Sequence, residues 1–235
     1  MKDFRDANEN PISTVTARVA AIQVKMLHLQ FRMKKIYQDQ EALNKKLPSY
    51  KSNREIIKGM NNAVYNCIDM LVTMEHLFQL IADILATPEL RNHFNTDMYK
   101  ILNKTKKITK KWKAVRNKLG GHIDIEIAEK FCEHHNYKGV FITDDIETDL
   151  SALNMLLIES AVNAARRTED IFGRDLNLKQ NGMPNEMRLF VEKLNEDWNA
   201  AFAYFEPTMK FMYEIGKKEK MECTDPSDWK GIIVD

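Results

Sequence analysis

The sequence predicts an all-α protein, a bundle of four or five long helices, on three observations. Only 8 Gly and 6 Pro occur among 235 residues, so turns are few. Apolar residues recur at steps of three and four over long stretches, which is the period of a helix face. No stretch shows the period-two alternation of a strand. The composition, 44% hydrophobic and 29% charged, fits a globular chain with a substantial core.

The most regular pattern predicts a long N-terminal helix from about Pro11 to Leu47, with Asn10 as its N-cap. Its heptad seam consists of Ile12, Val15, Val19, Ile22, Met26, Leu29, Met33, Ile36, Gln40 and Leu43. This helix can curve over its own bundle, or part of it can pack against a second copy of the chain. On the second interpretation, an Asp in place of Val19 or Ile22 should break assembly.

Two further helices follow. The second is expected over 53–86, with Ser52 as its N-cap, and Thr87-Pro88-Glu89 should end it and start another turn. The third, capped by Asn95 or Thr96, should run to the glycine pair 120–121, because Gly accepts the left-handed conformation of a helix end.

The remainder predicts a shorter helix over 124–135, a fourth long helix over 145–172 and a linker over 173–184. The fifth helix begins near Pro184, and Pro207 should kink or divide it, since proline cannot donate the helical hydrogen bond. Residues 1–215 would then form one helical-bundle domain, in which 1–47 is a possible dimerisation element, and 216–235 a polar C-terminal arm.

Composition also limits the classes of function. The net charge is only +1, so a basic binding site must be local. Three widely spaced cysteines, Cys67, Cys132 and Cys223, are typical of a reducing compartment. No signal-peptide pattern begins the sequence and no run of eighteen apolar residues is present, so we expect a cytoplasmic protein without membrane contact.

Familiar catalytic motifs are absent. The sequence has no phosphate-binding glycine loop, no HExxH and no calcium-binding loop. The residues His122, Asp124, Cys132, His134 and His135 include metal-compatible groups, but they lack a fourth ligand at a familiar spacing. We therefore expect neither a metal nor a cofactor, and half-buried Cys and solvated His side chains at these positions.

A local run, RNKLGGH, carries the candidate chemistry. Arg116 and Asn117 lie in the last turns of the third predicted helix and His122 follows the glycine pair. An imidazole can move protons near neutral pH, and a guanidinium offers donors that fit phosphate oxygens. The alternative is an ordinary helix end, in which the arginine interacts with the helix dipole and the histidine meets a free carbonyl.

This run resembles the HEPN domain family of α-helical bundles, whose members carry an Arg, often followed by a polar residue, four to six residues before a His. The resemblance covers seven residues within a helical context of roughly 53–215, and the Gly-Gly pair is a mild departure. It implies a metal-independent endoribonuclease of toxin or phage-defence type. Arg116 would bind the phosphate, His122 would act as acid or base and Asn117 would position them.

The resemblance also implies a homodimer and an acidic residue from an earlier helix. Glu75 is the candidate for that residue, with Asp69 and Asp83 as rivals. Lysines lead to the site along the third helix, and those expected to contact RNA are Lys104, Lys107, Lys110, Lys111, Lys113 and Lys118. A solvated amphipathic face is the alternative explanation of these lysines.

Two other functions stay open. One is a non-catalytic helical oligomerisation module, favoured by the heptad pattern of the first helix. The other is a nucleotide-binding domain without cleavage. A protein partner such as an antitoxin is left undetermined by the sequence.

Overall fold

The computed structural model describes residues 14–91, 94–119, 129, 133 and 146–218. These residues form helices and no strand, so the all-α prediction is confirmed for the described part of the chain. The elements are α1 (Thr14–Lys46), a 3-10 turn (Leu47–Ser49), α2 (Asn53–Ala86), α3 (Pro88–Arg91), α4 (Thr96–Leu119), α6 (Ile146–Ala165), α7 (Leu178–Asn181) and α8 (Met183–Lys218).

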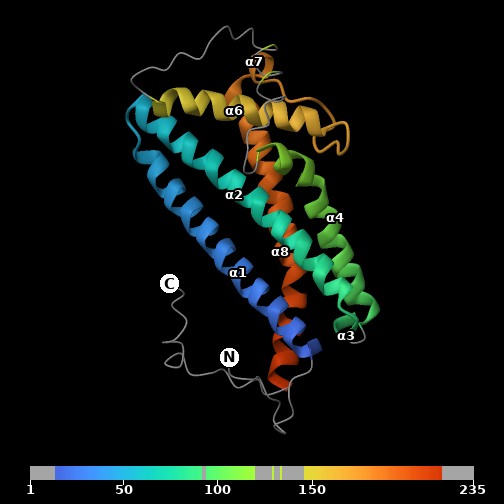
Figure 1. Ribbon diagram of the computed structural model, residues 1–235. Helices are drawn as coiled ribbons and strands as arrows, with labels where there is room; N and C mark the ends of the chain where they lie inside the picture. Colours follow the sequence, from blue (N-terminus) through green and yellow to red (C-terminus); the bar gives the residue numbers. More distant parts are fainter. Residues whose placement is uncertain (1–13, 92–93, 120–128, 130–132, 134–145, 219–235) are drawn as a thin grey trace, which may run out of the picture.

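The helix α2 is the centre of the bundle (Figure 1). It contacts α1 on one side and α4 on the other, while α6 crosses one end. The helix α8 packs along α4 and also touches α2 and α1. None of the described helices has the length and apolar character needed to cross a membrane.

The heptad seam of α1 faces the interior of its own bundle. Val19, Ile22, Met26 and Leu29 are all buried, and they belong to one continuous core with α2 and α8. The interpretation in which Val19 and Ile22 hold two copies together is therefore wrong. An Asp at either position would place an unpaired charge in the core and would attack the fold itself.

Helix starts follow the sequence closely. The hydroxyl of Ser52 accepts from the backbone N–H of Glu55 and the Glu55 carboxylate accepts from the Ser52 N–H, which is a complete capping box. Asn95, the first of two predicted caps, accepts the N–H of Met98 at 2.8 Å and so begins α4. Both helices therefore begin where local side-chain chemistry predicts.

The fourth helix ends earlier than predicted. It stops at Ala165 and not near Phe172, because the backbone N–H groups of Thr168 and Glu169 both turn back to the Ala165 carbonyl. Gly173 then takes a left-handed φ of 70°. The predicted linker over 173–184 contains the short helix α7.

Pro207 was predicted to kink or divide the last helix, but it does not divide it. The helix α8 is continuous from Met183 to Lys218, with Pro207 inside it. Buried residues before and after the proline, Phe205 and Thr208 among them, hold both halves against the same core. Packing thus outweighs the single missing backbone hydrogen bond, a tertiary effect that the local rule does not include.

Several predictions fall outside the described residues. They are the helix stop at the glycine pair 120–121, the helix over 124–135 apart from two single positions, and the arm beyond residue 218. The seam residue Ile12 also lies outside them.

Candidate functional site

One face of α4 is fixed in the core by Trp112. The indole N–H donates to the Asp197 carboxylate at 3.0 Å, and the ring meets the edges of Phe172 and Phe190 with centroids 6.3 and 5.9 Å away. Leu102 and Val115 are buried on the same side of the helix. These contacts fix the rotation of α4 about its axis and therefore which side chains it exposes.

The other face of α4 is basic. Lys106 and Lys113 lie over the Phe78 ring at 5.6 and 5.4 Å, and Lys104 lies over the Tyr204 ring at 5.3 Å. We call the predicted set Lys104, Lys107, Lys110, Lys111, Lys113 and Lys118, together with Lys106, the α4 basic face. No acidic residue follows Asp97 on this helix. A cation over an aromatic ring keeps its charge, so the face is strongly positive.

The lysines of this face differ in their ion pairs and exposure. Lys111 lies 3.8 Å from the Asp197 carboxylate, which also accepts from Trp112. Lys107 and Lys110 are exposed on the outer side of the helix, with no ion pair to any described residue. They are the lysines most available to an anionic partner.

Arg116 lies in the last turn of α4, on the side toward α2 and about half a turn around the helix from Lys107. It is half-buried, and its Nη1 donates to the Asn117 side-chain oxygen at 3.1 Å. Its Nε is buried and meets no hydrogen-bond acceptor among the described residues. The predicted pair Arg116–Asn117 is therefore in contact, and the guanidinium keeps unused donor capacity.

Glu75 is a buried carboxylate on α2, with only 7% of its surface exposed. One oxygen accepts from Gln79 at 3.0 Å, and the other is buried without a partner in the described part of the chain. The rivals differ in this respect. Asp83 binds Arg18 and Lys25 at 3.2 and 2.6 Å, and Asp69 lies 3.7 Å from Arg32, so both aspartates link α2 to α1.

His76, which was not a predicted site residue, lies among these charges. Burial is the main cause that lowers the pKa of its imidazole, and the positive charges of Arg32, Arg116 and His28 lower it further. The negative charge of Glu75 opposes the shift. The lowered pKa keeps the ring neutral at pH 7.

The contact with Arg32 indicates the tautomer of this ring. Arg32 Nη1 lies 3.4 Å from His76 Nδ1, and a guanidinium can only donate. Nδ1 is then the acceptor and the proton of the neutral ring is on Nε2. We call Arg32, Glu75, His76 and Arg116 the His76 cluster; it joins α1, α2 and α4.

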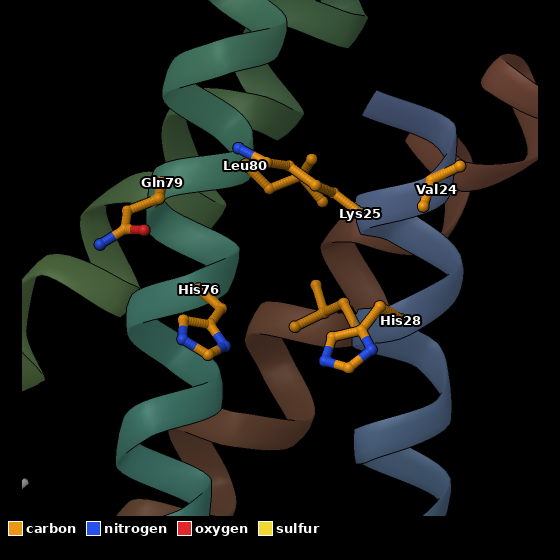
Figure 2. A pocket seen from close by; sticks show the side chains of 7 residues that line it. Val24, Lys25, His28, His76, Gln79 and Leu80 are labelled. Carbon is orange, nitrogen blue, oxygen red and sulfur yellow. The ribbon is translucent and has the colours of Figure 1, made fainter. Parts of the chain in front are cut away.

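A groove of about 420 Å³ opens beside this cluster, between α1 and α2. Figure 2 shows His28 of α1 and His76 of α2 facing each other across it. Lys25 and Gln79 complete its polar lining, and Val24, Leu29 and Leu80 supply apolar surface. The groove is therefore largely apolar, and its one lysine, Lys25, already binds Asp83.

The remaining predicted residues are not placed. His122 and the set of possible metal ligands around it, from Asp124 to His135, lie outside the described residues. Within the residues that are described, no three His, Cys, Asp or Glu side chains come together as metal ligands. Cys67 is a buried thiol whose pKa burial raises to about 12, so it is not a reactive nucleophile.

His76 could have been considered from the sequence, because Glu75-His76 is a polar pair in an otherwise apolar stretch. What the sequence lacks is the pairing of α2 with α1 and α4, which surrounds the ring with Arg32 and Arg116. Those residues are 44 and 40 positions away along the chain. Comparison with known proteins gives no further guide: no family model matches the chain, nor does any curated protein or solved structure at a significant level.

Proposed function

We propose that this protein is a cytoplasmic, HEPN-like endoribonuclease that binds RNA along the α4 basic face and cleaves it without a metal ion. The observation that carries the proposal is the position of Arg116. It lies in the last turn of the helix that carries these lysines and acts electrostatically on His76, the same ring that senses Glu75. Binding and reacting groups would therefore come from the same helix, with Arg116 on its side toward α2.

The lysines supply the binding step. A single-stranded RNA placed along α4 would meet Lys107 and Lys110 first, since these side chains are exposed. Phosphate contacts of this kind are independent of sequence and weaken as salt rises. Arg116 would take the scissile phosphate, because a guanidinium can donate two parallel hydrogen bonds to phosphate oxygens.

The chemical step requires two proton transfers. A base takes the proton of the ribose 2′-hydroxyl, the 2′-oxygen attacks phosphorus, and the bond to the 5′-oxygen breaks as that oxygen receives a proton. Arg116 would stabilise the negative charge of the pentavalent intermediate. His122 is the predicted proton-transfer residue, and the neutral His76 is suited to the role of a second. Glu75 would orient one imidazole.

The test is RNA cleavage with excess chelator present. We expect the wild type to nick a fluorescent single-stranded RNA, and Arg116→Ala and His122→Ala to reduce the rate by about 10²–10⁴-fold, the usual contribution of acid–base groups. Arg188→Ala is the control, since Arg188 is an exposed arginine on α8 whose ion pair with Glu192 is long, at 4.0 Å. Equal cleavage by His122→Ala and wild type would exclude this mechanism.

A second candidate is a non-catalytic helical interaction module, and one observation favours it. The helix α1 exposes several large apolar side chains on the side turned away from the bundle. That function predicts RNA or protein binding with no RNA product from any variant. A nucleotide-binding domain without cleavage would instead show thermal stabilisation by mononucleotides, again without product.

A further inference from the structure

The helix α1 has two apolar faces, and the bundle uses only one. Beside the buried heptad seam, Val24 and Leu27 are each 65% exposed and Phe31 is 67% exposed. Ala17, Ala20 and Ala21 extend the same face toward the N-terminal end of α1. At about 100° per residue these side chains lie opposite the buried seam. We call Ala17, Ala20, Ala21, Val24, Leu27 and Phe31 the outer stripe.

The polar and charged residues that flank this stripe are engaged by the bundle itself. Arg18 and Lys25 bind Asp83 of α2, as described above. On the other flank, Gln23 donates to the Met212 carbonyl of α8 at 2.9 Å and Gln30 contacts the Met209 sulfur at 3.1 Å. Between these flanks the stripe carries no Lys, Arg, Asp or Glu, and the exposed His28 lies on its side toward α2. Three large apolar side chains in register on a solvent-facing helix are typical of an interaction surface.

From this surface we infer that two copies of the chain associate through their outer stripes, with the two α1 helices antiparallel. A two-fold symmetric interface requires a surface that is complementary to itself. Suppose that the two-fold axis passes between Val24 of one copy and Val24 of the other. The numbers of two residues that face each other in the antiparallel pair then sum to 48, by this construction. Ala17 then faces Phe31, and Ala21 faces Leu27. Small residues at one end of the stripe therefore receive large residues from the other.

A parallel pair lacks this complementarity. It would place Phe31 against its own copy and leave alanine against alanine, with a gap between the helices. It would also align Lys34 and Lys35, the next two residues on or beside this face, with the same lysines of the second helix. Like charges so close together destabilise a pair, so the antiparallel arrangement is favoured on both steric and electrostatic grounds.

The stripe spans fifteen residues, about 21 Å of helix. Contact along four turns with its flanks is on the order of 1,200 Å², the lower end of stable interfaces. Val24 belongs both to the stripe and to the groove between α1 and α2. Association would therefore bring the second copy's α1 beside the groove that holds His28 and His76.

The experiment measures the mass of the full chain by sedimentation from about 1 to about 100 μM, a range that covers a micromolar Kd. Leu27→Asp should abolish the dimer or weaken it by more than tenfold. Tyr37→Asp is the matched control, because Tyr37 is also 67% exposed on α1 but lies roughly a third of a turn from the stripe. Both variants should keep the wild-type thermal transition at low concentration, since neither side chain is buried in the monomer.

Two results would overturn the inference. One is a wild type that is monomeric throughout; if Leu27→Asp then lowers its Tm, a segment of the same chain covers the stripe. The other is a dimer that Leu27→Asp leaves intact, because the interface would then be elsewhere.

A charge exchange tests the orientation. Ala21→Glu and Leu27→Lys should each weaken the dimer, and the double variant should recover it. In the antiparallel pair the introduced carboxylate faces the introduced ammonium. In a parallel pair each new charge faces its own copy, so a double variant weaker than both single variants would overturn the antiparallel arrangement.

Discussion

The helices α1 and α4 flank α2 on opposite sides, and they differ most on the faces that the bundle does not use. Toward the core both are apolar: α4 is held by the Trp112 ring and its hydrogen bond to Asp197, and α1 by aliphatic side chains such as Leu29. Toward solvent, α4 presents lysines and α1 presents the outer stripe.

This contrast shows that the fold requires a particular composition only on the helix face that packs against α2. A flanking helix needs only one apolar face to pack against α2, so the fold places no demand on the opposite face. One such face has become basic and the other apolar. The first suits a polyanion and the second suits another protein surface.

The largest loss of stability is expected from a substitution in the buried face of α4. Trp112→Ala should lower the free energy of unfolding by about 4 kcal/mol, because it removes a fully buried ring and leaves the Asp197 carboxylate without its donor. Urea denaturation followed by circular dichroism measures this. On α1, Leu29→Ala should cost about 3 kcal/mol. A larger loss for Leu29→Ala than for Trp112→Ala would show that α1 is the more firmly attached helix.

The second-largest effect is expected from reversing lysine charges on the outer faces of α4 and α1, because only the α4 lysines should bind RNA. The double variant Lys107→Glu, Lys110→Glu should weaken binding of single-stranded RNA by about 10- to 100-fold. It should reduce the slope of log K against log salt by about 1.4, the value for two lost phosphate contacts. The control changes two exposed lysines of α1, Lys34→Glu and Lys35→Glu. An equal loss in both variants, measured by fluorescence anisotropy, would mean that net charge and not the α4 basic face governs binding.

The ion pairs between α1 and α2 should contribute less. Asp83→Asn should cost about 1 kcal/mol at low salt, since Asp83 is partly buried and meets both Arg18 and Lys25. The cost should shrink as salt is added, because screening weakens partly exposed pairs. Glu41→Gln, which breaks the fully exposed pair with Lys45, should cost about 0.4 kcal/mol. A cost for Asp83→Asn that is independent of salt would argue against an electrostatic link.

The smallest effect concerns pH and the His76 cluster. Because the pKa of His76 is lowered in the folded protein, the unfolded chain takes up this proton more readily. Stability should therefore fall as the pH drops below about 6.5, the ordinary histidine value, and the fall from this group should end below the folded pKa. His76→Gln should lose less stability than wild type between about pH 7.5 and about pH 5.5. An identical pH dependence of the two proteins would contradict the lowered pKa.

How far sequence reasoning reaches depends on whether the deciding interactions are local. The start of α2 was predicted to the residue, because Ser52 and Glu55 form their capping box within four positions of each other. The basic face of α4 was predicted for the same reason, since a regular helix places Lys104, Lys107 and Lys111 on one side. The end of α6 was predicted wrongly, and the expected division of α8 at Pro207 does not occur. The continuity of α8 depends on packing with distant segments, whereas α6 ends in a local backbone turn at Ala165.

The candidate site divides in the same way. Arg116 and Asn117 were predicted as a pair and are in contact. Glu75 was predicted as a polar group on an apolar helix and is buried, with one oxygen that finds no hydrogen-bond partner in the described part of the chain. The role of His122 in catalysis stays a prediction. His76 was missed, because its environment is assembled from three helices.

The sequence by itself determined the helices, their apolar faces and the concentration of lysines before Arg116, because these depend on residues one or two turns apart. Only the tertiary structure decided that the heptad seam of α1 is internal and that Val24, Leu27 and Phe31 are left outside. It also decided which carboxylates form ion pairs: Asp83 meets two cations from α1, and Glu75 meets none among the described residues. Burial and charge pairing depend on which helices become neighbours, and that is a property of the packed chain.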